Sequence, residues 1–272
     1  MNYPNEIFTY PVNHKTKVAK ENIKKYYCRF IERECDKQSR TIKYPMGVCS
    51  VSIGNNKPII CPHRFLEDDL VFQNICKEEF GTLNNILLFP EVKLNGIGTF
   101  DFVLVKHKPI SNKVDEFCVV EFQSDSTTGT GKLVNALKDF MDGYDVTKKN
   151  YSFGMNTYNT IKLSYIQMLI KGQVMESWNK NAYWIMQEFV FDNMANRFHL
   201  ENLDFDKKLN THYYLYDLIE KGKIQRLEFI TKKSTSVNNL LTAFTHQPIP
   251  NIDNFVKKLE EKIKLKVGLL LE

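Results

Sequence analysis

Two runs of apolar residues constrain the fold of this chain more than any other feature: GTFDFVLV over residues 98–105 and FCVVEFQ over residues 117–123. Strands that are apolar on both faces are covered on both faces, which is the position of central strands in an α/β sandwich. A third run rich in β-forming residues, ILLFPEVKL, precedes them at residues 86–94. The chain is therefore predicted to have an α/β fold with a mixed central sheet.

Periodicity predicts the elements around these three strands. Apolar residues at helical spacing indicate helices at 66–80 and 131–141, before and after the strands. Further strands are expected near 161–170 and 182–191, and at 212–219 and 226–230, with helices near 235–245 and 252–266. The last helix contains the basic run VKKLEEKIKLK, whose apolar spacing is typical of an amphipathic packing helix. DNA contact and dimerisation are the less favoured interpretations of that run.

Length and composition place the chain in a broad class. Its 272 residues, of which 43% are hydrophobic, are enough for one large domain or a domain with a small appendage. The net charge of +5 permits a polyanionic partner. The sequence contains no apolar stretch of about eighteen residues, and the N-terminus lacks a basic flank followed by an apolar run. We therefore expect no membrane contact and a cytoplasmic location, where thiols stay reduced.

Four cysteines gather in a turn-rich segment that has little apolar core of its own. They are Cys28, Cys35, Cys49 and Cys61. Four thiolates can bind a metal tetrahedrally, and such a site contributes about 10–16 kcal/mol to the folding of small zinc modules. We predict a Cys₄ metal site within residues 1–65 and a second domain over 66–272; four separately buried cysteines are the alternative.

Each of the two apolar strands carries an acid near its end, Asp101 in one and Glu121 in the other. If residues 107–116 connect an antiparallel hairpin, Val105 faces Phe117 and Asp101 faces Glu121. Two carboxylates held together at the edge of an apolar sheet repel each other and lose hydration, so either one of them is protonated or a cation lies between them. Mg²⁺ accepts one or two carboxylates together with waters and a phosphate oxygen. The two acids are therefore predicted to bind Mg²⁺.

The spacing of Asp101, Glu121 and Gln123 resembles the D…(D/E)-x-K core of the PD-(D/E)XK nuclease superfamily, in the variant in which glutamine replaces lysine. With it, the strings CRFIERECDKQSR, GVCSVSIGNNKPIICPHRFLE, LFPEVKL, IGTFDFVLV and VVEFQSDSTTGTG occur in one order. Together they resemble the NotI-type branch of the type II restriction endonucleases, which joins a Cys₄ metal-binding segment to such a core. The resemblance covers residues 25–140.

The resemblance implies roles for individual residues. Asp101 and Glu121 would bind the catalytic Mg²⁺, and Gln123 would orient the attacking water without supplying the charge of a lysine. A further upstream acid is implied, for which Glu91 is the first choice and Glu78 or Glu79 the alternatives. The Cys₄ metal would be structural, as iron or zinc. The loop SDSTTGTGK over 124–132 suits phosphate binding or a plain helix cap equally well.

The expected function is Mg²⁺-dependent, sequence-specific cleavage of double-stranded DNA by a homodimer acting on a palindromic site. A non-catalytic Cys₄ DNA-binding protein on a nuclease scaffold is one alternative. A structure-selective repair nuclease of the same superfamily is the other. Cleavage of plasmid into discrete bands distinguishes a sequence-specific endonuclease from both alternatives.

Overall fold

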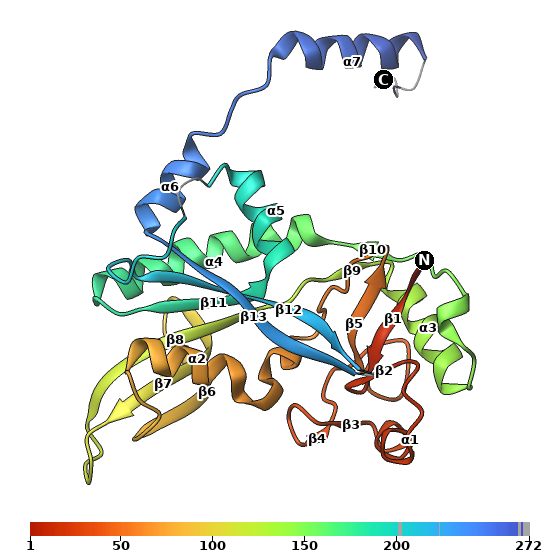
Figure 1. The fold of residues 1–272 in the computed structure, drawn as a ribbon. Helices are drawn as coiled ribbons and strands as arrows, with labels where there is room; N and C mark the ends of the chain where they lie inside the picture. The colour runs from red at the N-terminus through yellow and green to blue at the C-terminus, as the bar shows by residue number, and fades with distance from the viewer. Residues whose placement is uncertain (201–202, 223, 266–267, 269–272) are drawn as a thin grey trace.

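A mixed six-stranded sheet forms the centre of the protein in a computed structural model, which describes residues 1–200, 203–222, 224–265 and 268. Its strand order is β13-β12-β11-β8-β7-β6 (Figure 1). The bounds are β6 (Ile86–Leu94), β7 (Gly98–His107), β8 (Val114–Gln123), β11 (Ala182–Gln187), β12 (Thr211–Lys221) and β13 (Ile224–Thr235). Strands β8, β11 and β12 run parallel, whereas the other neighbours are antiparallel. The predicted mixed sheet is therefore confirmed.

The hairpin of β7 and β8 has the expected register. Val105 pairs with Phe117, and the ladder continues to Phe102 opposite Val120. One step further along this ladder lie Asp101 and Glu121. The sequence pattern thus predicted both strands, and the register that follows from a connection over residues 107–116 agrees with the observed pairing.

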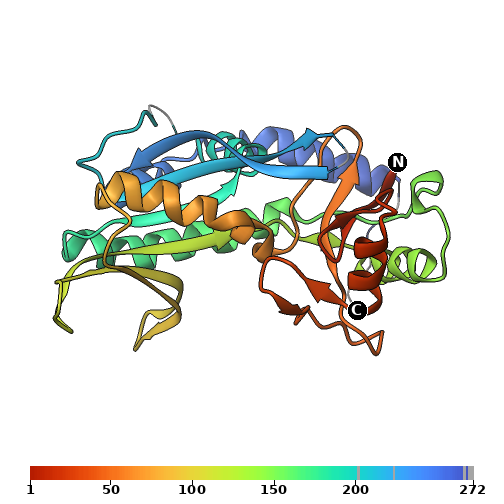
Figure 2. The same ribbon diagram turned by 60° about the horizontal axis from the view of Figure 1, so that its bottom comes forward.

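Helices cover both faces of the sheet (Figures 1 and 2). On one face lies α2 (Leu70–Glu79), whose buried Phe72 and Ile75 join the core beneath β7, β8, β11 and β12. The helix predicted from residue 66 starts at residue 70, because the 3-10 segment η1 (Pro62–Asp69) ends with positive φ at Asp68 and Asp69. The opposite face is covered by α4 (Thr157–Ser177), α5 (Glu188–Phe198) and α6 (Val237–Thr245).

One predicted strand is wrong, and another is confirmed only in its first part. The strand expected near 161–170 is the middle of α4, and the strand expected over 182–191 ends at Gln187, where α5 begins. Residues 161–170 carry apolar side chains on every side of the helix, with Tyr165 and Met168 buried and Leu163 and Ile166 exposed. A run without a polar face gives no helical periodicity, so the pattern alone did not separate a helix from a buried strand.

The N-terminal unit has its own small sheet, β2-β1-β5, built from β1 (Asn2–Ile7), β2 (Tyr10–Pro11) and β5 (Val48–Ile53). Around it lie α1 (Lys17–Lys24), the short strands β3 (Tyr27–Cys28) and β4 (Arg33–Glu34), and α3 (Thr130–Met141). The helix predicted at 131–141 is thus confirmed as α3. Its buried Leu133 and Leu137 share one core with Ile7 and Val48, so α3 packs on the N-terminal unit rather than on the central sheet. The division at residue 65 stays a prediction.

The remaining elements are short or peripheral. They are η2 (Val146–Lys148), β9 (Thr127–Thr128), β10 (Gly154–Met155) and α7 (Ile252–Lys264). Helix α7 buries none of its residues and stands clear of the rest of the protein (Figure 1). It confirms most of the helix predicted at 252–266, whose last residue lies outside the described ones. None of the described helices is long and apolar enough to cross a membrane.

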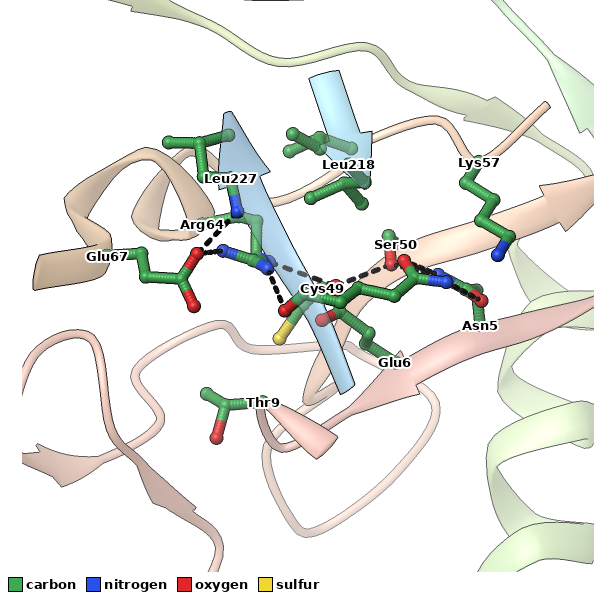
Figure 3. A network of polar contacts seen from close by, with 12 residues as sticks. Asn5, Glu6, Thr9, Cys49, Ser50, Lys57, Arg64, Glu67, Leu218 and Leu227 are labelled. Carbon is green, nitrogen blue, oxygen red and sulfur yellow. Dashed lines mark hydrogen bonds and ion pairs between the residues drawn. The ribbon is translucent and has the colours of Figure 1, made fainter. Parts of the chain in front are cut away.

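A buried polar network joins the N-terminal unit to the central sheet (Figure 3). The guanidinium of Arg64, in η1, is fully buried and donates to the Oε2 atoms of Glu6 at 3.0 Å and Glu67 at 2.9 Å. It also donates to the backbone oxygen of Gln225 on β13 at 3.0 Å. The N–H of Leu227, also on β13, reaches Glu67 at 2.6 Å. One cation therefore connects β1, η1 and β13.

We expect Arg64→Met to lower the free energy of unfolding by about 3–5 kcal/mol, because the change leaves the buried Glu6 without its cation and Glu67 with only the partly exposed Arg226. Urea unfolding at neutral pH measures this loss. Arg226→Met is the matched control, since Arg226 also binds Glu67 but from a partly exposed position; its effect should stay below about 1 kcal/mol. Equal effects of the two substitutions would contradict the structural role given to Arg64.

The same network makes stability depend on pH. Burial alone would raise the pKa of Glu67, but Arg64 and the N–H of Leu227 hold that pKa below its ordinary value. A lowered folded-state pKa stabilises the protein at pH values above the unfolded pKa and loses that effect as the pH falls through the folded pKa. Melting temperature should therefore fall on acidification below about pH 4.5, and less steeply in Glu67→Gln.

Candidate active site

The two predicted acids meet at one end of the sheet, on adjacent strands. Asp101 on β7 is half-buried, and its Oδ2 accepts a hydrogen bond of 2.8 Å from the backbone N–H of Phe122 on β8. Glu121, the residue before Phe122, is only 3% exposed. The hairpin thus fixes Asp101 beside Glu121 through a backbone contact, which constrains its position more than a contact between two side chains would.

A lysine that sequence reasoning missed completes this cluster. Lys171 extends from α4, and its Nζ lies 2.7 Å from Oε2 of Glu121 and 2.7 Å from the backbone oxygen of Thr99. The same Nζ stands 5.3 Å from the ring centre of Phe100. Lys171 is 6% exposed. The sequence did contain an indication of this lysine, because Lys171 is the single charged residue between 163 and 175. If such a stretch forms a buried helix, its one charged side chain is buried as well and needs a partner.

The second carboxylate oxygen of Glu121 has no hydrogen-bond partner among the residues that the structure describes. Its Oε1 is buried and makes no hydrogen bond, whereas Oε2 is bound by Lys171. Burial, and then the neighbouring charge of Asp101, raise the pKa of Glu121 to about 7 despite Lys171. Burial likewise raises the pKa of Asp101, against the N–H of Phe122 and the charge of Lys171. A buried carboxylate oxygen left without a donor, beside a second acid, favours a bound cation.

Glu91 lies on β6, the strand next to β7, directly opposite Asp101. Its neighbours Pro90 and Val92 pair with Phe102 and Phe100 on β7, so Glu91 stands opposite Asp101 in the same ladder. The residue interrupts β6 with a φ of +53° and is exposed. Its charge contributes to the raised pKa of Asp101. The structure therefore brings the first-choice upstream acid next to the pair.

The alternative upstream acids are engaged elsewhere. Glu79 accepts hydrogen bonds from the side chains of Asn181 at 2.8 Å and Tyr183 at 2.6 Å. Glu78 forms ion pairs with Lys207 and Lys232. Tyr183 belongs to the core on the α2 side of the sheet, opposite the face from which Lys171 reaches Glu121. Among the described contacts, neither acid touches Asp101 or Glu121.

Gln123 follows Glu121 by two residues, so both side chains leave β8 on the same face. Gln123 is half-buried, and its amide donates to the adjacent backbone oxygen of Ser124 at 2.9 Å. The loop that follows is largely structural: Asp125 is buried and accepts from the hydroxyl of Thr157, the first residue of α4, at 2.6 Å. This bond fixes the start of the helix that carries Lys171.

The four cysteines predicted to bind a metal are all buried in the N-terminal unit. Burial raises the pKa of Cys28 to about 11, with smaller contributions from Cys35 and Cys61. Cys49 is likewise affected by Cys61 and Cys28, so the fold gathers the four thiols in one region. Among the described residues, however, no group of three or more histidine, cysteine or acidic side chains is arranged to hold a metal ion. The predicted Cys₄ centre is therefore not preformed here.

The fold and the acid cluster fit an α/β nuclease, with a mixed central sheet that holds paired carboxylates on adjacent strands. A family model described as Restriction endonuclease NotI matches residues 13–229, which is well over half of the chain. The chain therefore belongs to the NotI restriction endonuclease family. No curated protein matches it. Family membership supports a type II restriction endonuclease, a hydrolase that binds double-stranded DNA and cuts it at specific sites.

Proposed function

We propose that this protein is a Mg²⁺-dependent endonuclease of the PD-(D/E)XK kind, which hydrolyses phosphodiester bonds in double-stranded DNA and acts as a homodimer. The observation that carries the proposal is the buried Oε1 of Glu121, which lies next to Asp101 and has no partner among the described residues. A structural ion pair with Lys171 accounts for one carboxylate oxygen of Glu121 but not for the second, which is buried without a protein donor among the described residues.

Asp101 and Glu121 are the residues that would hold Mg²⁺. Mg²⁺ takes one or two carboxylates and completes its shell with waters and phosphate oxygens, so two acids are enough as its protein ligands. When bound, Mg²⁺ lowers the pKa of a coordinated water and stabilises charge that develops on the phosphate. Glu91, exposed beside Asp101, is placed to add a ligand through water.

Lys171 supplies the positive charge that the E-x-Q sequence lacks. Gln123 can position a water molecule through hydrogen bonds but carries no charge. Lys171 lies 2.7 Å from Glu121 and keeps that carboxylate oriented, although it comes from a helix about fifty positions later in the chain. Asp101 and Glu121 would thus bind Mg²⁺, Gln123 would orient the attacking water, and Lys171 would hold Glu121 in place.

Plasmid cleavage tests the function. Supercoiled plasmid with Mg²⁺ should be cut into discrete bands by the full chain. A non-catalytic DNA-binding protein would only shift the plasmid in a gel. A repair nuclease would cut branched junctions or flaps in preference to intact duplex, without fixed bands. Either of these results would contradict the proposal.

We also propose a structural iron or zinc ion, bound by Cys28, Cys35, Cys49 and Cys61. The donor set suits tetrahedral coordination. Burial raises the thiol pKa at all of these positions, and backbone N–H groups partly oppose it at three of them, namely those of Phe30 and Ile31 at Cys28, Lys37 at Cys35 and His63 at Cys61. Such donors stabilise thiolates. Rotation of buried side chains would have to bring the four sulfur atoms into one coordination sphere.

Elemental analysis of freshly purified protein is expected to find about one iron or zinc ion per chain. Cys49→Ser and Cys61→Ser should then lose folded protein, because a structural metal contributes directly to folding. Added Mg²⁺ should not rescue them. Cys76→Ser is the control, since Cys76 lies in the α2 core, away from the cluster. Native protein without iron or zinc would rule out this part of the proposal.

A further inference from the structure

Helix α7 presents an apolar face that nothing in the described structure covers. The exposed side chains on this face, with their exposed fractions, are Ile252 72%, Phe255 62%, Val256 42%, Leu259 43% and Ile263 73%. Their spacing puts them on one side of the helix. A helix of 13 residues that buries nothing is marginal in water, because isolated helices of this length gain little from their own hydrogen bonds. The helix therefore needs a partner surface.

A second uncovered apolar face lies on α4. Leu163, Ile166 and Ile170 are 65%, 52% and 45% exposed and follow one another at helical spacing. They point away from the buried side of α4, which packs through Tyr165 and Met168 onto the sheet. The chain thus has two unpartnered apolar surfaces, one on its body and one on a helix that stands away from it.

The charges on α7 argue against a nucleic acid or a lipid surface as its partner. Its polar face mixes both signs, with four lysines against Asp253, Glu260 and Glu261, so its net charge is close to zero. Helices that bind phosphate backbones or anionic lipids carry a clear excess of positive charge. An apolar face flanked by mixed charges is typical of a helix that packs against protein.

We propose that α7 is a dimerisation arm, whose apolar face packs on the exposed α4 face of a second copy of this chain. A two-fold axis makes the exchange reciprocal, so both faces of each copy are covered at once. The connection over 247–251 contains Pro248 and Pro250 and has no helix or strand, which keeps the arm extended from α6. Figure 1 shows α7 held beyond α6, away from its own α4.

The area is adequate for such a dimer. The eight side chains on the two faces are 42–73% exposed, so at about 60–120 Å² for a fully exposed aliphatic side chain they offer on the order of 300–500 Å² of apolar surface per copy. A standard interface buries about 800 Å² per partner, of which about 60% is apolar. The two faces together supply most of that apolar share, whereas α7 paired with a second α7 alone would supply much less.

This inference deepens the proposed function, because a two-fold dimer matches a palindromic site, and it rests on that function only for the choice of two-fold symmetry. Its test uses the full chain without DNA or Mg²⁺. If α7 does not mediate dimerisation, the cleavage assay can still confirm the proposed nuclease function. If the protein does not cleave DNA, the sedimentation result still decides whether α7 mediates dimerisation.

Sedimentation velocity at micromolar concentration should give a dimer for the wild-type chain. Phe255→Glu with Leu259→Glu on α7, and Leu163→Glu with Ile166→Glu on α4, should each raise the dimer dissociation constant at least about 100-fold, because each places charges in an apolar interface. Asn254→Glu with Lys257→Glu changes the polar face of α7 and should remain dimeric. Circular dichroism confirms that each variant is folded.

Mixing the α7 variant with the α4 variant decides which surfaces meet. In the mixed dimer one intact α7 faces one intact α4, so dimers should reappear although neither variant dimerises alone. A dimeric α4 variant would mean that α7 pairs with α7 and would overturn the proposal. A monomeric wild-type chain, or a mixture that stays monomeric, would overturn it as well.

Discussion

Glu121→Gln is expected to reduce the single-turnover rate of DNA cleavage by at least about 10³-fold while leaving the protein folded. The substitution keeps the size of the side chain but removes the charge that would hold Mg²⁺. Glu121 is buried, and its pKa is raised to about 7, so its ionisation costs stability in the metal-free protein. A raised folded-state pKa means that this cost appears as the pH rises from about 4.5 to about 7. Without metal, Glu121→Gln should therefore melt no lower than wild type at pH 8.

Companion variants define the site around Glu121. Asp101→Asn should lose cleavage to a similar extent and still bind duplex DNA in a Ca²⁺ gel shift. Gln123→Ala should lose about 10²-fold, as expected for one residue that positions a water. Glu79→Gln is the matched control, because Glu79 sits on the opposite face of the sheet and bonds to Asn181 and Tyr183. Wild-type cleavage by either acid variant would mean that the pair is not the metal site.

Lys171→Met is expected to lower the cleavage rate by about 10²-fold or more, and to shift its pH dependence. Lys171 lowers the pKa of Glu121, so its removal should raise that pKa further and require a higher pH before the carboxylate is ionised. The acidic limb of the rate profile should therefore move to higher pH. Methionine matches the volume of the lysine stem, so the fold should survive in the packed interior.

Lys171→Arg tests whether charge alone is sufficient. It keeps the cation and should retain part of the activity and most of the wild-type pH profile. A purely structural lysine would behave differently: Lys171→Met would lose stability, and its pH profile would not move. An unchanged rate and profile in Lys171→Met would contradict the role that we assign to this residue.

Sequence analysis predicted the hairpin of β7 and β8 together with its register. The register followed from the assumed connection over residues 107–116 rather than from the apolar pattern, and it brings Asp101 to Glu121. The pattern of α4 was misread because Leu163, Ile166 and Ile170 give the helix no polar side. Lys171 was missed for the same reason, since its partner could not be foreseen before α4 was known to be a helix crossing the sheet.

Long-range contacts could not be predicted from the sequence. Nothing in the pattern of η1 indicates that Arg64 joins β1 to β13, because each partner lies in a different element. The packing of α3 on the N-terminal unit was also missed. An amphipathic helix shows which of its faces is buried but not which element covers that face.

The central claim is that Asp101 and Glu121 form the metal-dependent centre of a site-specific DNA endonuclease. Sequencing the ends of plasmid cut by the wild-type chain in Mg²⁺, beside Glu121→Gln under the same conditions, tests it most directly. We expect wild-type ends to fall at one recurring, two-fold symmetric sequence and the variant to leave the plasmid intact. Ends scattered without a common sequence, or the same cuts by Glu121→Gln, would contradict the claim.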